Sequence, residues 1–154
     1  MIDVRDIHED DRDAWRRLFT EYGVFYDTAF TDTVLDGVWA WLMSAESDLC
    51  AVVAVDPSTS SGQAAGAVIG FAHYRNLPDT FTAGNEWYLD DLYVEPGHRG
   101  SGAGTALIDA VAERAASDGG GKLRWITAAD NVTAQSVYDK VATRTSWVTY
   151  EKLT

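Results

Sequence analysis

Cysteine is almost absent from this sequence, with Cys50 the single example in 154 residues. One thiol can form neither an intrachain disulfide nor a thiolate metal cluster, and His8, His73 and His98 are too scattered to suggest a metal site. Cys50 lies in the apolar run 49–55, so we expect a small buried hydrophobic side chain rather than a nucleophile. The chain is therefore expected to fold on its hydrophobic core, without a metal.

Long apolar runs and positive charge are also scarce. No apolar segment approaches the roughly 20 residues of a membrane span, and the N-terminal residues lack the basic and apolar blocks of a signal peptide. We therefore expect a cytoplasmic protein that does not bind membranes. The formal net charge of -12 argues against general nucleic-acid binding, which needs a basic surface. An acidic surface permits a cationic substrate, although solubility alone would also explain the acidity.

The rest of the composition is that of a globular domain. Hydrophobic residues make up 46% and charged residues 23%, and the length suits one core. No repeat or linker divides the chain. Residues 1–154 are therefore predicted to form a single domain.

Hydrophobic periodicity predicts both strands and helices. Trp15, Leu18, Phe19 and Tyr22 share one helical face, whereas short β-branched runs indicate buried strands. Turn-forming residues predict loops over 56–66 and 76–85. The expected strands are 1–5, 49–55, 67–74, 87–94, 123–127 and 146–153, and the expected helices are 8–22, 35–42, 102–117 and 131–141. This order, β-α-α-β-β-β-α-β-α-β, predicts an α/β (α+β) fold with a mixed sheet.

The most informative segment is a strand that runs into a glycine-rich turn and then a helix. Gly100, Gly102 and Gly104 allow backbone N–H groups to approach a ligand, and a helix N-terminus adds free N–H groups and partial positive charge. Together with Arg99 they favour a pyrophosphate. The spacing does not match the dinucleotide fingerprint, and no Lys follows the glycines as in nucleotide hydrolases. A turn without a ligand is the alternative.

Three stretches together resemble a known family. Arg99-Gly100-Ser101-Gly102-Ala103-Gly104 resembles the acetyl-CoA pyrophosphate loop of GNAT-superfamily N-acetyltransferases, whose pattern is Arg/Gln-x-x-Gly-x-Gly/Ala. Asp90-Asp91-Leu92-Tyr93-Val94 resembles the strand before that loop, especially in the diamine acetyltransferase branch. Asn131-x-x-Ala134-x-x-x-Tyr138-x-Lys140 resembles a later helix of the family. The resemblance covers the whole chain and is strongest over residues 86–140.

The resemblance implies both a fold and an activity. The fold would be a GNAT-like, mostly antiparallel sheet of six to seven strands with helices on both faces, in which the fourth strand carries a bulge and splays from the fifth. The activity would be direct transfer of an acetyl group from acetyl-CoA to a primary amine of a small molecule, such as a polyamine, by a homodimer. The alternatives are a protein or peptide acceptor and a non-catalytic acyl-CoA sensor. Tyr138 argues against a sensor, which needs no acid.

The resemblance also assigns roles to individual residues. Tyr138 is expected to protonate the departing thiolate, and Asp90 or Asp91 to take the proton of the amine, directly or through water. Tyr26 and Asp90 are the expected substrate-binding residues. The expected cofactor-binding residues are Leu92, Tyr93, Val94, Arg99, Gly100, Ser101, Gly102, Ala103, Gly104, Thr105, Asn131 and Ala134.

Each assignment has a structural alternative. Tyr138 shares a helical face with Ala134 and could belong to the core, and Asn131 could be only a helix N-cap. Tyr26 and its aromatic neighbours could form a core cluster instead of an acceptor wall. Asp90 and Asp91 face opposite ways on a regular strand, so both serve one cleft only if a bulge turns one of them. The match to the diamine branch favours Asp90 as the member that faces the cleft. Residues 141–147 lack the Gly-Phe of many relatives, which leaves the acceptor more open than the cofactor.

Overall fold

The computed structural model describes residues 1–59 and 66–154. Within them a five-stranded sheet has the order β1-β2-β3-β4-β5. The first four strands pair antiparallel and β5 pairs parallel with β4. The elements are β1 Asp3–Asp6, η1 Glu9–Asp11, α1 Arg12–Phe25, α2 Asp32–Leu42, β2 Leu49–Asp56, β3 Ala67–Asp79, β4 Gly84–Val94, η2 Pro96–His98, α3 Ala103–Ser117, β5 Lys122–Arg124 and α4 Val132–Val141, where η1 and η2 are single 3-10 turns.

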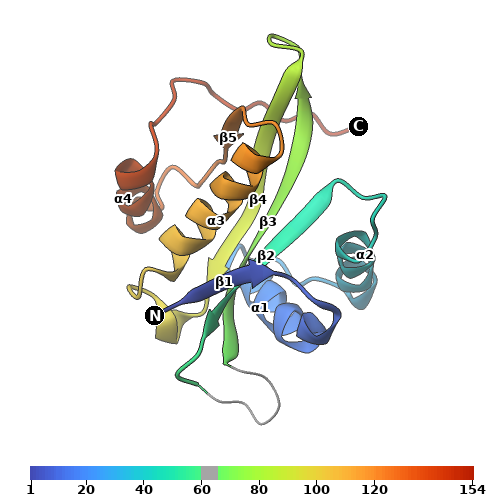
Figure 1. Ribbon diagram of the computed structural model, residues 1–154, viewed down its shortest axis with the longest axis vertical. Helices are drawn as coiled ribbons and strands as arrows, with labels where there is room; N and C mark the ends of the chain where they lie inside the picture. Colours follow the sequence, from blue (N-terminus) through green and yellow to red (C-terminus); the bar gives the residue numbers. More distant parts are fainter. Residues whose placement is uncertain (60–65) are drawn as a thin grey trace.

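Helices cover both faces of the sheet, as expected. Helices α1 and α2 lie on one side, and α3 and α4 lie on the other (Figure 1). Alternate side chains of the strands therefore enter two separate cores. Trp15 and Phe71 are fully buried in the core under α1, and Leu107 and Val52 are fully buried in the core under α3. The predicted α/β fold with a mixed sheet is confirmed.

Two strands are longer than the sequence suggested. The loop expected over residues 76–85 is wrong, because β3 continues to Asp79 and β4 begins at Gly84. The carboxylate of Asp79 accepts hydrogen bonds from the N–H of Phe81 and the hydroxyl of Thr82, at 2.9 Å each, which closes a tight turn. Pro78 lies in this ladder opposite Asn85. The loop expected over 56–66 falls largely on residues 60–65, which lie outside the described residues.

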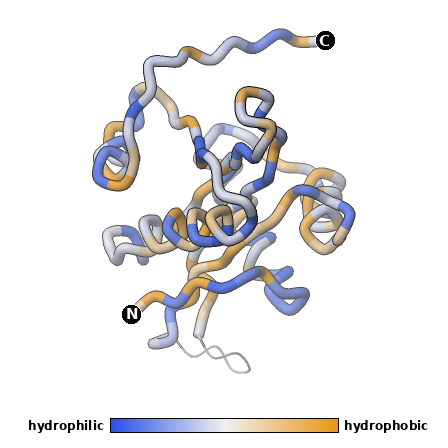
Figure 2. The backbone as a smooth tube through the Cα atoms, turned by 45° about the horizontal axis from the view of Figure 1, so that its top comes forward, coloured by the Kyte–Doolittle hydropathy of each residue, from blue (hydrophilic) through white to orange (hydrophobic). Residues whose placement is uncertain are grey.

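The end of the chain departs most from expectation. The sheet of six to seven strands is wrong for the described residues, and the strand order agrees only as far as α4. Strand β5 has three residues, not five, and residues 146–153 form no strand. Residues 142–154 are exposed and run away from the sheet (Figure 2). An alternating pattern forms a strand only beside a neighbouring edge, and β5 provides a very short one.

Two further expectations concern Cys50 and membranes. Cys50 is exposed near the start of β2, so its predicted burial is wrong. The apolar run begins at the solvent and becomes buried only from Ala51 onward. None of the helices in the described ranges is long and apolar enough to cross a membrane.

Candidate functional site

The glycine-rich turn presents a row of free backbone donors. From Gly100 to Thr105, no backbone N–H donates a hydrogen bond to any residue that the structure describes. Gly100 and Gly102 have φ of 78° and 88°, which only glycine adopts easily. Gly102 precedes the first residue of α3, so several of these N–H groups also lie at a helix N-terminus. The turn is therefore suited to an anion with several oxygen atoms.

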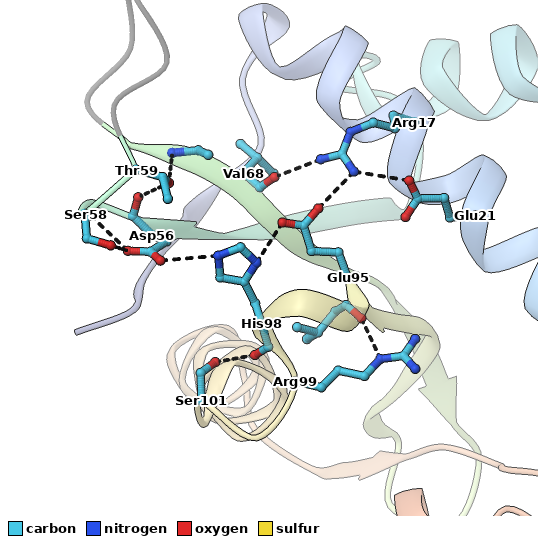
Figure 3. A network of polar contacts seen from close by, with 12 residues as sticks. Arg17, Glu21, Asp56, Ser58, Thr59, Val68, Glu95, His98, Arg99 and Ser101 are labelled. Carbon is cyan, nitrogen blue, oxygen red and sulfur yellow. Dashed lines mark hydrogen bonds and ion pairs between the residues drawn. The ribbon is translucent and has the colours of Figure 1, made fainter.

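A chain of polar contacts fixes the segment that leads into this turn (Figure 3). His98 of η2 lies between two carboxylates, with Nδ1 2.8 Å from Glu95 and Nε2 3.4 Å from Asp56. Glu95 also pairs with Arg17 of α1 at 2.9 Å, and Arg17 pairs with Glu21 at 3.2 Å. The network joins α1, the end of β2 and the segment after β4. His98 is thus held from the side of α1 and β2, which makes it a structural residue of the turn.

Arg99 folds back over the end of β4. Its Nε donates to the carbonyl oxygen of Val94 at 3.0 Å. Its guanidinium carbon lies 5.5 Å from the ring centroid of Tyr93 and 5.9 Å from that of Phe25. These contacts fix a positive charge over the end of β4. Arg99 directly precedes the glycine-rich turn, and its role toward a ligand stays a prediction.

The edge of β4 next to the turn is open. Strand β5 pairs with β4 only at Glu86, Trp87 and Tyr88, so the two strands separate beyond Tyr88. Because the N–H of Glu95 donates to Ile69 of β3, the alternation of the ladder points the N–H and C=O groups of Leu92 and Val94 away from β3. The predicted splay is confirmed, and it leaves an edge that an extended ligand can pair with.

A bulge brings both aspartates to one face. His73 lies opposite Asp91 and Tyr74 lies opposite Leu89, which leaves Asp90 as the extra residue of β4. The two carboxylates contact alternate residues of β3: Asp91 lies 2.8 Å from Nδ1 of His73, and Asp90 accepts from Nε of Arg75 at 3.0 and 3.1 Å. Burial raises the pKa of Asp90, and Arg75 opposes that rise.

His73 and Arg75 were missed by sequence reasoning as site residues. His73 lies in the strand expected over 67–74 and Arg75 just beyond its expected end, and neither position reveals the register that brings them to the aspartates.

Tyr138 faces the same gap from α4. It packs against the core under α3 together with Leu92 and Val94, and its ring lies 5.4 Å from that of Trp125. Burial raises the pKa of the Tyr138 hydroxyl, and Tyr26 raises it further. Tyr138 is half-buried, and because its pKa is raised it keeps its proton at neutral pH. The effect of Tyr26 on this pKa shows that the hydroxyl lies near the end of α1.

The aromatic residues at the end of α1 divide into two groups. Phe30 packs on Phe19 in the core, at 4.6 Å between ring centroids. Phe25 and Tyr26 are 54% and 46% exposed, and Tyr26 lies edge-on to Tyr22 at 5.0 Å. Phe25 and Tyr26 thus have exposed rings, and the substrate-binding role of Tyr26 stays a prediction, whereas Phe30 belongs to the core.

Asn131 is the N-cap of α4. Its side-chain oxygen accepts from the N–H of Ala134 at 3.2 Å. Asn131 thus acts as a helix N-cap, which was the alternative to a cofactor contact. Ala134 lies in the first turn of the same helix. In the described part of the chain, no three His, Cys, Asp or Glu side chains gather as a metal site would require.

Comparison with known proteins gives a consistent family. Residues 4–142 match the model of the acetyltransferase (GNAT) family. The chain is 34% identical over 151 residues to the D-amino-acid N-acetyltransferase of Saccharomyces cerevisiae, covering 98% of this chain and 90% of the yeast protein. It is 35% identical over 89 residues to the thialysine N-epsilon-acetyltransferase of Mus musculus, covering 58% of this chain and 51% of the mouse protein.

Solved structures agree with the fold. A complex of AAC(6')-Iy with the bisubstrate analog CoA-S-monomethyl-acetylneamine superimposes with a TM-score of 0.81 at 21% identity, covering 100% of this chain and 99% of that one. At this identity the likeness concerns the fold alone.

Proposed function

The chain belongs to the GNAT family of acetyltransferases, and on that premise we propose that it binds acetyl-CoA along the open edge of β4 and acetylates a primary amine of a small molecule. The observation that carries the proposal is the row of unpaired N–H groups from Gly100 to Thr105. They fit a pyrophosphate, and Arg99, which directly precedes them in the chain, is the nearest cation in sequence. Leu92 and the N–H of Val94 fit an extended pantetheine arm through their outward-pointing backbone groups, as an added strand would, while the carbonyl oxygen of Val94 accepts from Arg99.

Acetyl-CoA supplies a thioester-activated acetyl group. The residues of this chain then have three tasks. Asp90 or Asp91 takes a proton from the ammonium group, so that the amine nitrogen has a free electron pair for the acetyl carbon. The outward N–H of Leu92 is placed to stabilise negative charge on the acetyl oxygen. The Tyr138 hydroxyl gives its proton to the sulfur when the carbon–sulfur bond breaks, and the second proton that the nitrogen loses as it becomes an amide restores that hydroxyl.

The acceptor is proposed to be a small amine. The acidic pair Asp90 and Asp91 supports the diamine acetyltransferase branch and a polyamine, whereas the relatives named above act on D-amino acids and on thialysine. All of these acceptors carry an ammonium group, which suits the carboxylates at the bulge and the exposed ring of Tyr26. Release of thiol from acetyl-CoA over diamines, D- and L-amino acids and a short peptide tests this choice. Turnover only with the peptide would overturn the small-molecule acceptor, and no turnover at all would favour a sensor.

We also propose a cytoplasmic homodimer. The support is the run of exposed apolar side chains after α4: Trp147, Val148, Tyr150 and Leu153 are 78%, 72%, 90% and 99% exposed. Such a run is characteristic of a surface that another molecule covers.

The cytoplasmic location is supported by a different feature. A single exposed thiol, Cys50, suits a reducing compartment.

A further inference from the structure

His73 is a buried histidine with both ring nitrogens engaged. The residue is 1% exposed, and its Nε2 lies 2.8 Å from the indole nitrogen of Trp15, while Nδ1 lies 2.8 Å from the carboxylate of Asp91. An indole N–H can only donate a hydrogen bond. Nε2 must therefore accept, which leaves the proton of the neutral ring on Nδ1. His73 consequently donates to Asp91.

The surroundings of His73 hold the ring in this orientation. The ring centroids of Phe71, Phe19 and Trp15 lie 4.6, 5.0 and 6.0 Å from that of His73. A flipped ring would lose both hydrogen bonds inside an aromatic enclosure, where unpaired polar groups are costly. The chain Trp15–His73–Asp91 thus connects the core under α1 with the bulge of β4.

The two aspartates of the bulge have different partners. Asp90 accepts two contacts from the charged guanidinium of Arg75, which also lies 5.4 Å from the ring centroid of Tyr88. The His73 partner of Asp91 is a neutral donor. Tyr22 lies near Asp91 as well, because burial and then the charge of Asp91 raise the pKa of its hydroxyl far above the usual value. Asp90 therefore has a counter-charge, whereas Asp91 forms no ion pair with a Lys or Arg among the described residues, and 23% of its side chain is exposed beside the splay.

We propose that His73, locked by Trp15, is a positioning residue that holds Asp91 as the receptor for the ammonium group of the acceptor, while Asp90 serves to fix the bulge through Arg75. This inference rests on the proposed function, because it names which carboxylate meets the amine. Asp91 takes one proton from the ammonium group and becomes a neutral acid, and the amine keeps the electron pair. His73 cannot accept that proton, since Nδ1 already carries one and Nε2 faces an N–H. The proton therefore leaves from Asp91 to water.

Two substitutions at His73 separate its two hydrogen bonds. The amide of His73→Asn reaches the position of Nδ1 and can still donate to Asp91, whereas that of His73→Gln reaches the position of Nε2 and can satisfy only Trp15. We expect His73→Gln to raise the KM for the amine about tenfold or more, with the affinity for acetyl-CoA unchanged. His73→Asn should stay within about threefold of wild type. Equal KM values for wild type and both variants, or equal losses in both, would overturn the proposal.

A second pair of variants assigns the carboxylates. Asp91→Asn should raise the amine KM more than Asp90→Asn does, and the reverse order contradicts the assignment. If a His73 variant does not fold, long-range proton–nitrogen NMR of the wild-type protein tests whether Trp15 fixes the His73 tautomer. The measurement distinguishes a protonated Nδ1 from a protonated Nε2 without any substrate. A proton on Nε2 would overturn the proposal. If the wild type acetylates no amine, the proposed function fails, and the NMR result still shows separately whether His73 donates to Asp91.

Discussion

The role of Tyr138 can be tested by removing a single oxygen atom. Tyr138→Phe removes only the hydroxyl, and the ring keeps its contacts with Trp125. We expect kcat to fall about 100-fold, the lower end of general-acid contributions, because no other side chain is assigned to protonate the sulfur. Affinity for acetyl-CoA and the melting temperature should be unchanged. The measurement is steady-state thiol release, with the exposed Tyr150→Phe as control. Full turnover in Tyr138→Phe would show that Tyr138 is a core residue only.

At the same scale, sequence reasoning located the bulge residues but not their arrangement. The motif around Asp90 and Asp91 predicted a cleft, and the period of two in a strand made a bulge necessary for both to face it. Which residue of β3 meets each aspartate depends on register, and register depends on contacts across the sheet. Trp15 and His73 are 58 residues apart, so no local pattern connects them. The division of roles between the aspartates required the structure.

The start of α1 depends on a buried carboxylate. The helix expected from residue 8 begins instead with the turn η1, where Asp11 accepts from Arg5 at 2.7 and 2.8 Å and from the N–H of His8 at 2.8 Å. Burial alone would raise the pKa of Asp11, but the hydrogen bond from Arg5 and that from His8 outweigh it, and the pKa is lowered from 3.8. The contribution of Asp11 to stability is therefore present above pH 3.8 and is lost as the pH falls through the lower, folded pKa.

We expect Asp11→Asn to reduce the free energy of unfolding by about 2 kcal/mol at neutral pH, since hydrogen bonds to a buried charge are lost. The difference from wild type should shrink as the pH falls from 3.8 through the lower, folded pKa, because the Asp11 carboxyl is protonated first in the unfolded and then in the folded protein. Urea unfolding at several pH values measures it. Asp13→Asn, an exposed carboxylate in the first turn of α1, is the control. A difference that grows on acidification would have the wrong sign.

The turn between α3 and β5 packs against the beginning of β4 and so positions β5. Residues 119–121 are glycines with positive φ, and a Cβ on Gly121 would overlap the backbone oxygen of Asn85 in β4. Gly121→Ala should therefore destabilise the protein by about 2 kcal/mol or more, through strain and displacement of β5. Thermal unfolding tests this, with Gly97→Ala as control because a Cβ there meets no atom within 4 Å. Equal melting temperatures would mean that β5 shifts at no cost.

At the scale of elements, the periodic patterns predicted all four α-helices of the described residues. Each expected strand is present except the last, over residues 146–153. Buried faces determine these patterns, so an amphipathic segment reveals itself locally. The patterns failed where pairing with a neighbouring strand decides whether a segment becomes a strand. The ladder extends past Pro78 because the strand opposite is available, and residues 146–153 form no strand because no long edge lies beside them.

At the scale of the whole molecule, the segment after α4 leaves a run of apolar side chains uncovered. In an extended segment Trp147 and Leu153 point to one side and Val148 and Tyr150 to the other. We expect the wild type to sediment with twice the mass of the chain, and Trp147→Asp combined with Tyr150→Asp to sediment as a monomer. Surface variants at Glu46 and Asp48 serve as the control. A monomeric wild type would contradict the proposed homodimer. It would not contradict the proposed acetyl transfer, whose residues all belong to one chain.

The central claim is that the backbone from Gly100 to Thr105 holds acetyl-CoA, and Gly104 offers the cleanest test. It has an ordinary φ and nothing within 4 Å of an added Cβ, unlike Gly102, where a positive φ would strain any variant. The measurement is titration calorimetry with acetyl-CoA on the wild type, Gly104→Ala, Gly104→Val and the control Gly97→Val. We predict saturable binding to the wild type, a small loss for alanine, and at least about a tenfold loss for valine with unchanged melting temperature. No binding to the wild type, or equal affinity in all four proteins, would contradict it.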